Sequence, residues 1–156
     1  YVTASPNTKH QVVLGNLYLL IARFLEEHEI GRAFLSPFDI VFTEFDVVEP
    51  DLLYMSNQRA AEILTSKNVQ GAPELVIEIG SPSTRQRDET IKRRLYERAG
   101  VSEYWFVDPD VDVVRVYQRE DDHFSRPREL SAEAGDVLTT LLLPGLDMPL
   151  ARIFKA

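Results

Sequence analysis

The chain has 156 residues, no cysteine, and a net charge of -8 at pH 7 from 17 basic and 25 acidic residues. This length predicts a single domain over residues 1–156 that buries a core without cross-links, and the lack of cysteine excludes disulfides, thiolate zinc sites and a cysteine nucleophile. The acidic balance argues against general electrostatic adhesion to nucleic acid but leaves room for a local basic site.

The sequence also predicts a protein with no membrane partner. No apolar stretch approaches the roughly 18 residues of a membrane span, and no signal peptide is visible. A chain without cysteine fits the reducing cytoplasm, which is the location we expect. The chain opens at Tyr1 rather than Met, which predicts a truncated or processed N-terminus.

The first half of the chain predicts one long helix followed by short strands. A cap and turn cluster at Ser5–Thr8 precedes a helix over residues 8–28, whose apolar face also carries His10. Pro50 interrupts the strands that follow the helix. We expect strands at Ala33–Leu35, Asp39–Thr43, Phe45–Val48 and Leu52–Met55, then a short helix at Asn57–Leu64 and a polar loop at Thr65–Pro73.

A buried strand and the helix after it stand at the centre of the prediction. Leu75–Ile79 is a short β-branched run closed by Gly80, which is how a buried strand ends. A second helix is expected over residues 84–99. At about 100° per residue, its sheet-facing side is predicted to hold Asp88, Ile91, Lys92, Leu95, Tyr96 and Ala99.

The remaining segments predict a parallel crossover and further strands. Glu103–Val107 is an aromatic-rich strand, and the strand–helix–strand spacing predicts that it lies parallel to Leu75–Ile79. Val111–Gln118 alternates in polarity and should pair back with it as a hairpin. Two more strands are expected at Phe124–Leu130 and Asp136–Leu142, before a docked tail that reaches Phe154.

Two acidic residues are the first candidates for chemistry. A carboxylate such as Glu78 in an apolar strand costs several kcal/mol when unpaired, so it usually has a cation or dedicated donors beside it. Asp51 follows Pro50 at a strand interruption, from which a side chain can be aimed out of the sheet, although Pro-Asp is also common in turns. Two converging carboxylates form a hard oxygen site suited to Mg²⁺ or Mn²⁺.

Lys92 and His10 each allow two interpretations. Lys92 can stabilise a pentacoordinate phosphate, or it can form an ordinary helix ion pair with Asp88 four residues earlier. Its position toward the sheet favours a role in the site. His10 on an apolar helical face is either a packed core histidine or a site residue. Three aromatic residues are expected in the core: Tyr96, Tyr104 and Trp105.

A series of short motifs runs in order along the chain. They are Pro50-Asp51, Gly71–Ile79, Ser81–Thr84, Asp88, Lys92, Tyr96, Gly100–Pro109 and Leu143–Leu146. This series resembles the Uma-two family of predicted endonucleases, which belongs to the restriction-endonuclease-like superfamily with the PD-(D/E)XK motif. The resemblance extends from about Ser5 to Phe154, and it implies a mixed β-sheet flanked by α-helices.

The resemblance also implies the residues of a nuclease site. Asp51 would be the first metal-binding acid, Glu78 the second, and the backbone carbonyl of Ile79 a third ligand for Mg²⁺ or Mn²⁺. The superfamily pattern places a lysine two residues after the second acid, where this chain has Gly80. The resemblance suggests that Lys92 has taken over that role from the helix, as in other lysine-migrated members of the superfamily.

Further residues are implied around this site. His10 matches a position near the site in the family, which makes it a possible accessory residue. Six of the 17 basic residues lie on or just before the helix at residues 84–99. Among these six we expect Arg85 and Arg87 to bind substrate.

We therefore predict an α/β fold of the restriction-endonuclease-like type, in which Asp51 and Glu78 converge at one edge of a mixed sheet. The expected function is metal-dependent hydrolysis of nucleic-acid phosphodiesters, with DNA favoured over RNA as the partner. A homodimer would let two sites cut two strands. The alternative is a non-catalytic nucleic-acid- or protein-binding module that keeps the fold and docks through the basic helix. Metal binding separates the two functions, because only the nuclease requires it.

Overall fold

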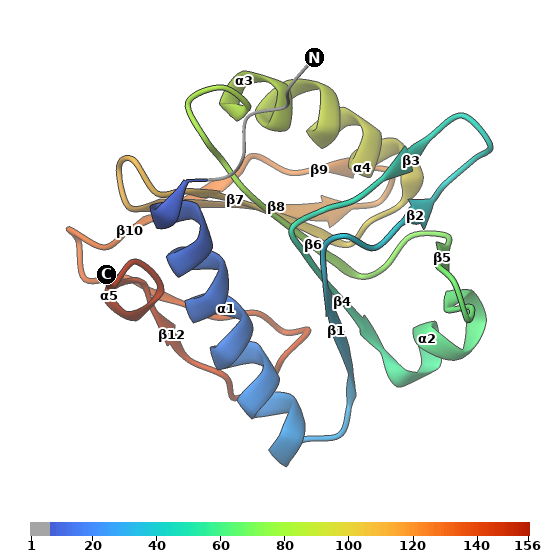
Figure 1. The fold of residues 1–156 in the computed structure, drawn as a ribbon, viewed down its shortest axis with the longest axis horizontal. Helices are drawn as coiled ribbons and strands as arrows, with labels where there is room; N and C mark the ends of the chain where they lie inside the picture. Colours follow the sequence, from blue (N-terminus) through green and yellow to red (C-terminus); the bar gives the residue numbers. More distant parts are fainter. Residues whose placement is uncertain (1–6) are drawn as a thin grey trace.

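A computed structural model describes residues 7–156, so Tyr1 and the Ser5-Pro6 part of the predicted cap cluster lie outside the described residues. The helices are α1 (Thr8–Glu27), α2 (Asn57–Ile63), α3 (Arg85–Arg87), the π-helical turn η1 (Asp88–Lys92), α4 (Arg93–Ala99) and α5 (Leu150–Ile153). The strands are β1 (Gly31–Leu35), β2 (Ile40–Val41), β3 (Val47–Val48), β4 (Leu52–Ser56), β5 (Val69–Gln70), β6 (Leu75–Ile79), β7 (Glu103–Asp108), β8 (Val113–Glu120), β9 (His123–Phe124), β10 (Arg128–Ser131), β11 (Val137–Leu138) and β12 (Met148–Pro149). Figure 1 shows how these elements are arranged.

One mixed sheet forms the centre of the molecule. Its strands lie in the order β1-β4-β6-β7-β8-β10, with β9 paired to β8. The parallel pairing of β6 with β7 confirms the predicted crossover, and the antiparallel pairing of β7 with β8 confirms the predicted hairpin. Helices flank this sheet, so the α/β class predicted from the sequence is confirmed.

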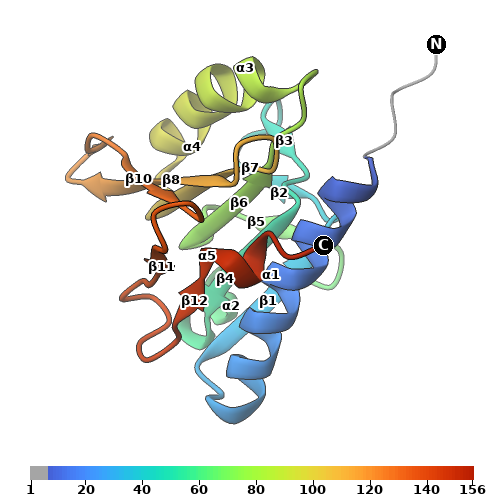
Figure 2. The same ribbon diagram turned by 90° about the vertical axis from the view of Figure 1, so that its left-hand side faces the viewer.

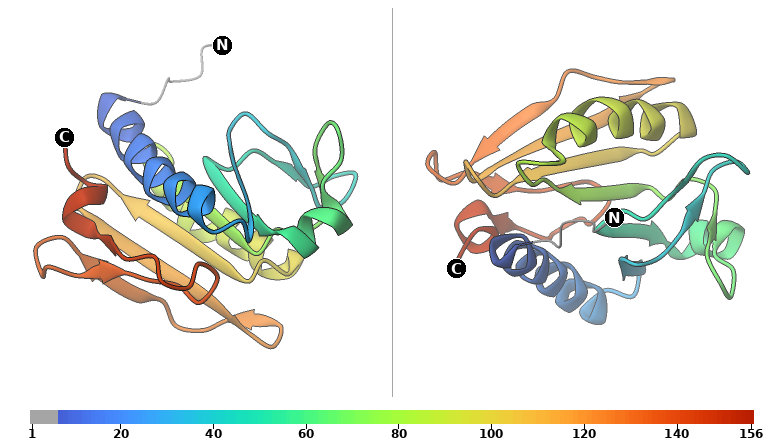
Figure 3. Two further views of the ribbon diagram at one scale, coloured as in Figure 1. Left: turned by 90° about the horizontal axis from the view of Figure 1, so that it is seen from below. Right: turned by 45° about the horizontal axis from the view of Figure 1, so that its top comes forward.

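Two apolar layers cover the two faces of the sheet. Helix α1 and the C-terminal segment with α5 lie on one face, and the continuous helix α3–η1–α4 lies on the other (Figures 2 and 3). Helix α1 buries Val13, Leu17 and Ile21 completely, because residues four apart share a face of a helix. Within residues 7–156, no helix is long and apolar enough to cross a membrane.

Several predicted strand boundaries are wrong. The strands expected at 39–43 and 45–48 shrink to β2 and β3, because Thr43 Oγ1 accepts hydrogen bonds from the N–H groups of Phe45 and Asp46 and closes a turn. The expected polar loop at 65–73 contains β5, which pairs with β2. The strand expected at 124–130 splits into β9 and β10 around Pro127, which has no N–H to donate, and the one expected at 136–142 shrinks to β11.

The helix after β6 is also not the uniform α-helix that was predicted. Asp88 and Tyr96 are buried as expected, but Ile91 is 65% exposed. The π-helical turn η1 explains the difference, because it carries one more residue than an α-helical turn and shifts the inward-facing positions.

Candidate active site

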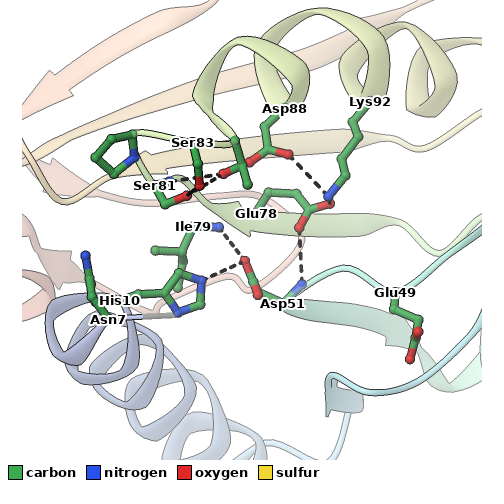
Figure 4. Close-up of a pocket in the computed structure, with 12 residues that line it drawn as sticks. Asn7, His10, Glu49, Asp51, Glu78, Ile79, Ser81, Ser83, Asp88 and Lys92 are labelled. Atoms are coloured by element: carbon green, nitrogen blue, oxygen red, sulfur yellow. Dashed lines mark hydrogen bonds and ion pairs between the residues drawn. The ribbon is translucent and has the colours of Figure 1, made fainter. Parts of the chain in front are cut away.

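A cavity of about 360 Å³ opens at the end of β6, between the start of β4 and the first residues of α1. It brings together five of the residues predicted for the site: His10, Asp51, Glu78, Ile79 and Lys92. Figure 4 shows their side chains gathered from α1, the start of β4, the end of β6 and η1. The predicted edge is thus formed by the ends of two central strands rather than by an outer strand.

The two carboxylates lie next to each other because the pairing of β4 with β6 ends just before them. The last paired residues are Leu52 and Ile77. Beyond them, the Asp51 N–H donates to Glu78 Oε1 at 3.3 Å, and the Ile79 N–H donates to Asp51 Oδ2 at 2.7 Å. Each carboxylate therefore holds the backbone of the opposite strand, which fixes both side chains at the cavity.

Glu78 is the most strongly perturbed group in the cavity. Glu78 is only 3% exposed, and its Oε2 accepts a hydrogen bond from Tyr96 Oη at 2.7 Å. Burial raises its pKa to about 7; Lys92 opposes this rise, whereas the neighbouring charges of Asp51 and Asp88 add to it. Glu78 is therefore a carboxylate with too little positive charge around it to stay fully ionised at neutral pH.

Lys92 reaches Glu78 from the π-helical turn. Its Nζ lies 3.0 Å from Glu78 Oε2 and 3.2 Å from Asp88 Oδ1. Lys92 therefore forms the helix ion pair with Asp88 and also lies beside Glu78 in the cavity. Gly80, where the resemblance leads one to expect a lysine, has no room for a side chain. A Cβ atom on Gly80 would lie 2.5 Å from Cζ of the buried Phe106 ring.

His10 joins the site from the first turn of α1. Asn7 caps this helix by accepting the His10 N–H on Oδ1 at 2.9 Å, which fixes the start of the helix beside the cavity. The His10 Nε2 lies 3.4 Å from Asp51 Oδ2. That contact raises the pKa of His10, while burial opposes the rise. His10 thus lines the cavity and is also buried, at 7% exposure.

The predicted substrate residues Arg85 and Arg87 do not line the cavity. The Arg85 guanidinium lies 3.1 Å from Asp108 Oδ2 and 2.6 Å from Asp110 Oδ2, so both carboxylates hold it. Arg87 is exposed and forms no ion pair with any residue in the described range 7–156.

Three functional candidates were missed by the sequence analysis. Tyr96 and Tyr104 are buried as predicted, but they also donate hydrogen bonds to Glu78 and to the Asp88 carbonyl. Asp88 lines the cavity itself. The spacing of Asp88, Lys92 and Tyr96 at intervals of four was a usable signal, because it places all three on one side of a helix.

The donor set at the strand ends fits a hydrated divalent cation. No three His, Cys, Asp or Glu side chains within residues 7–156 are close enough to hold an ion by themselves. However, Mg²⁺ keeps several waters and is usually bound by one or two carboxylates. Asp51 and Glu78 supply two, and the Ile79 backbone lies beyond the last β4–β6 pair, close enough to His10 to raise the pKa of that side chain.

Comparisons with known proteins identify the family of the chain and a solved structure with a similar fold. Residues 1–151 match the model of the Uma2 family, described as a putative restriction endonuclease. The chain is also similar to a crystal structure titled as a putative nuclease belonging to DUF820 from Anabaena variabilis. The TM-score is 0.81 at 21% identity, over 99% of this chain and 84% of that chain. A comparison with curated proteins found no match.

Proposed function

This chain belongs to the Uma2 family, and on that premise we propose that it is an endonuclease that hydrolyses DNA phosphodiesters with Mg²⁺ or Mn²⁺. The membership confirms the resemblance drawn from the sequence. One observation carries the proposal: Asp51 and Glu78 meet in a cavity with the Lys92 Nζ 3.0 Å from Glu78. DNA is favoured over RNA because a restriction endonuclease acts on DNA.

The strand ends supply the residues that would hold the cation. Asp51 and Glu78 would do so with their carboxylates, and Ile79 with its backbone carbonyl. A divalent ion bound there supplies an activated water and neutralises charge on the phosphate. The residues of the site favour such an ion, because burial and, to a smaller extent, the charges of Asp51 and Asp88 oppose ionisation of Glu78.

Lys92 supplies a fixed positive charge at the same place. Its pKa is raised because the charges of Glu78 and Asp88 outweigh the effect of burial, which would lower it. Lys92 therefore stays protonated at neutral pH. A cation in this position stabilises the negative charge that develops as the phosphate becomes pentacoordinate. His10 holds the Asp51 carboxylate from the opposite wall.

A basic helix face, made of Arg87, Arg94 and Arg98, would attract the nucleic-acid backbone. All three side chains are exposed, and none pairs with an acid within residues 7–156. The acids of this helix are already engaged: Asp88 with Lys92, Glu89 with Arg115, and Glu97 with the Phe124 N–H. The outward charge of the helix is therefore positive, although the chain as a whole is acidic.

This face also keeps the alternative function open. A non-catalytic module would dock nucleic acid or protein on the basic helix face and would not need the cavity. Its binding would weaken steeply with salt, because contacts to phosphates release counterions.

Cleavage of supercoiled plasmid DNA tests the proposal. We expect nicked and linear products with Mg²⁺ or Mn²⁺, none in chelator, and none with Asp51→Asn. The control Glu49→Gln alters another carboxylate of the same cavity and should stay active. Direct conversion to linear DNA would support a homodimer that cuts both strands. Salt-dependent DNA binding without cleavage under any metal would overturn the nuclease and favour the docking module.

A further inference from the structure

Asp88 is a buried carboxylate in the cavity for which the proposed reaction has no use. It is 2% exposed, lies in η1, and places Oδ1 3.2 Å from the Lys92 Nζ. Glu78 Oε2 lies 3.0 Å from the same Nζ. Figure 4 shows the ammonium group held between the two carboxylates. An acid buried at this cost calls for a role.

We propose that Asp88 is a positioning residue that holds the Lys92 ammonium in the cavity. This inference rests on the proposed nuclease function and adds a residue to it. When Glu78 binds a cation, its charge is shared with that ion and holds Lys92 less strongly. Lysine is a flexible four-carbon chain with about 2 kcal/mol of rotamer entropy, so a second anchor keeps its ammonium in place.

The π-helical turn brings Asp88 round to the side of the helix on which Tyr96 lies. In a straight α-helix of 3.6 residues per turn, positions eight apart such as Asp88 and Tyr96 differ by roughly 80° around the axis. The π-helical turn accommodates one extra residue, so Asp88 and Tyr96 are placed as if seven residues apart. The angle between them around the axis is then roughly 20°. Asp88 is thereby turned to the side from which Tyr96 donates to Glu78. The same shift leaves Ile91 on the outside.

Side-chain donors fix this turn in place. The buried Tyr104 reaches from β7 and donates its hydroxyl to the Asp88 carbonyl at 2.9 Å. Thr90 Oγ1 donates to the Gln86 carbonyl at 2.6 Å, and Arg93 Nε donates to the Glu89 carbonyl at 2.9 Å. Backbone carbonyls that lose their helical partners need such replacements. Because Tyr104 belongs to the central sheet, the sheet itself sets where Asp88 points.

The test compares two neutralised acids of one turn. Asp88→Asn removes the contact with Lys92, whereas the control Glu89→Gln removes an ion pair with Arg115 outside the cavity. We expect Asp88→Asn to lower kcat for DNA cleavage by about 10- to 100-fold, the usual scale for a group that orients a site residue. KM and Mn²⁺ uptake should stay at parent values, and Glu89→Gln should leave all three unchanged.

A double variant shows whether Asp88 acts through the lysine. In a Lys92→Met background, Asp88→Asn should have no further effect on kcat. A further loss there would mean that Asp88 acts independently and would overturn the proposal. Loss of Mn²⁺ uptake in Asp88→Asn alone would also overturn it, because Asp88 would then be a metal ligand.

Two further measurements test the role of Asp88 if Asp88→Asn fails to fold or if the parent shows no cleavage. If Asp88→Asn does not fold, Tyr104→Phe removes only the hydroxyl that holds the turn, with the adjacent Tyr117→Phe as control; a kcat unchanged by Tyr104→Phe would overturn the proposal. If the parent cleaves nothing, the nuclease proposal has failed. The contact between Asp88 and Lys92 is then read from a double-mutant cycle of unfolding free energies in chelator. Absence of coupling in that cycle would overturn the inference about Asp88 itself.

Discussion

Two buried glutamates lie near opposite ends of the β6–β7 pair and have very different surroundings. Glu78 is 3% exposed and pairs in register with Phe106, whereas Glu103 is 5% exposed and pairs with Leu75. Glu103 accepts hydrogen bonds from two neutral donors, Trp105 Nε1 at 3.0 Å and Thr140 Oγ1 at 2.6 Å. Glu78 instead shares its surroundings with a lysine, a tyrosine and two further carboxylates.

The comparison shows that burial of a carboxylate does not by itself indicate a functional site. Glu103 is satisfied by donors fixed in the core, and nothing in its surroundings would be improved by a cation. Glu78 lines a cavity, and its burial, together with the charges of Asp51 and Asp88, makes its ionisation unfavourable, which a cation would reverse. The two glutamates therefore differ in access to a cavity and in whether their partners are charged or neutral.

The largest expected difference between them is in catalysis. Glu78→Gln removes a proposed metal ligand and should lower DNA cleavage by roughly 100-fold or more, which is the scale of losing a group that supports the transition state. Glu103→Gln should keep parent activity per folded molecule, because Glu103 touches no cavity residue through its hydrogen bonds. Steady-state cleavage assays, normalised by circular dichroism, provide the measurement. Equal losses in both variants would remove the distinction.

The next difference concerns stability against pH in chelator. Because burial raises the pKa of Glu78 from 4.5 to about 7, the folded state binds its proton more tightly than the unfolded state. Its contribution to stability is therefore complete below about pH 4.5 and is lost as the pH rises through about 7. Between pH 5 and pH 8, the free energy of unfolding in urea should fall by about 2 to 3 kcal/mol more for the parent than for Glu78→Gln. Parallel profiles for the two proteins would contradict the raised pKa.

The sequence predicted the fold better than it predicted the details of the site. The strong patterns were those set by one local period, such as the α1 face and the apolar run of β6, and these positions are buried in the structure. The two-residue strands were not predictable, because β5 is defined by its pairing with β2 rather than by its own residues. Hydrogen bonding with a distant partner decides such elements.

The site was predictable where a residue type is unusual for its element. Glu78 in an apolar strand was such a case. Glu103 also lies in an apolar strand, so this signal alone does not distinguish the two glutamates. Tyr96 and Tyr104 appeared to be ordinary core residues, since a hydroxyl's partner depends on three-dimensional structure. The π-helical turn was invisible for the same reason: its extra residue is held by Tyr104, which lies 16 positions from Asp88 in the chain.

A third, smaller difference separates the donors of the two glutamates. Thr140→Val replaces a hydroxyl by a methyl of similar shape and leaves Glu103 Oε2 without its donor, so it should cost about 1 to 3 kcal/mol. Tyr96→Phe also removes one donor, from Glu78, but Lys92 remains 3.0 Å from the same oxygen. We expect a smaller loss there. Chemical denaturation in chelator at pH 7 compares them, and a larger loss for Tyr96→Phe would show that Glu78 depends mainly on a neutral donor.

The smallest effect is the response of the fold to metal. A ligand that binds only the native state at ten times its Kd stabilises it by about 1.4 kcal/mol. For a domain of this size, that corresponds to a rise in Tm of about 3 to 6 °C. Mn²⁺ should produce this rise in the parent and in Glu103→Gln but not in Glu78→Gln, because only Glu78 would contribute a ligand. Differential scanning fluorimetry with Mn²⁺ against chelator measures it. Equal shifts in all three proteins would place the ion elsewhere on the acidic surface, and Glu78 would then be, like Glu103, a carboxylate that the fold holds for its own sake.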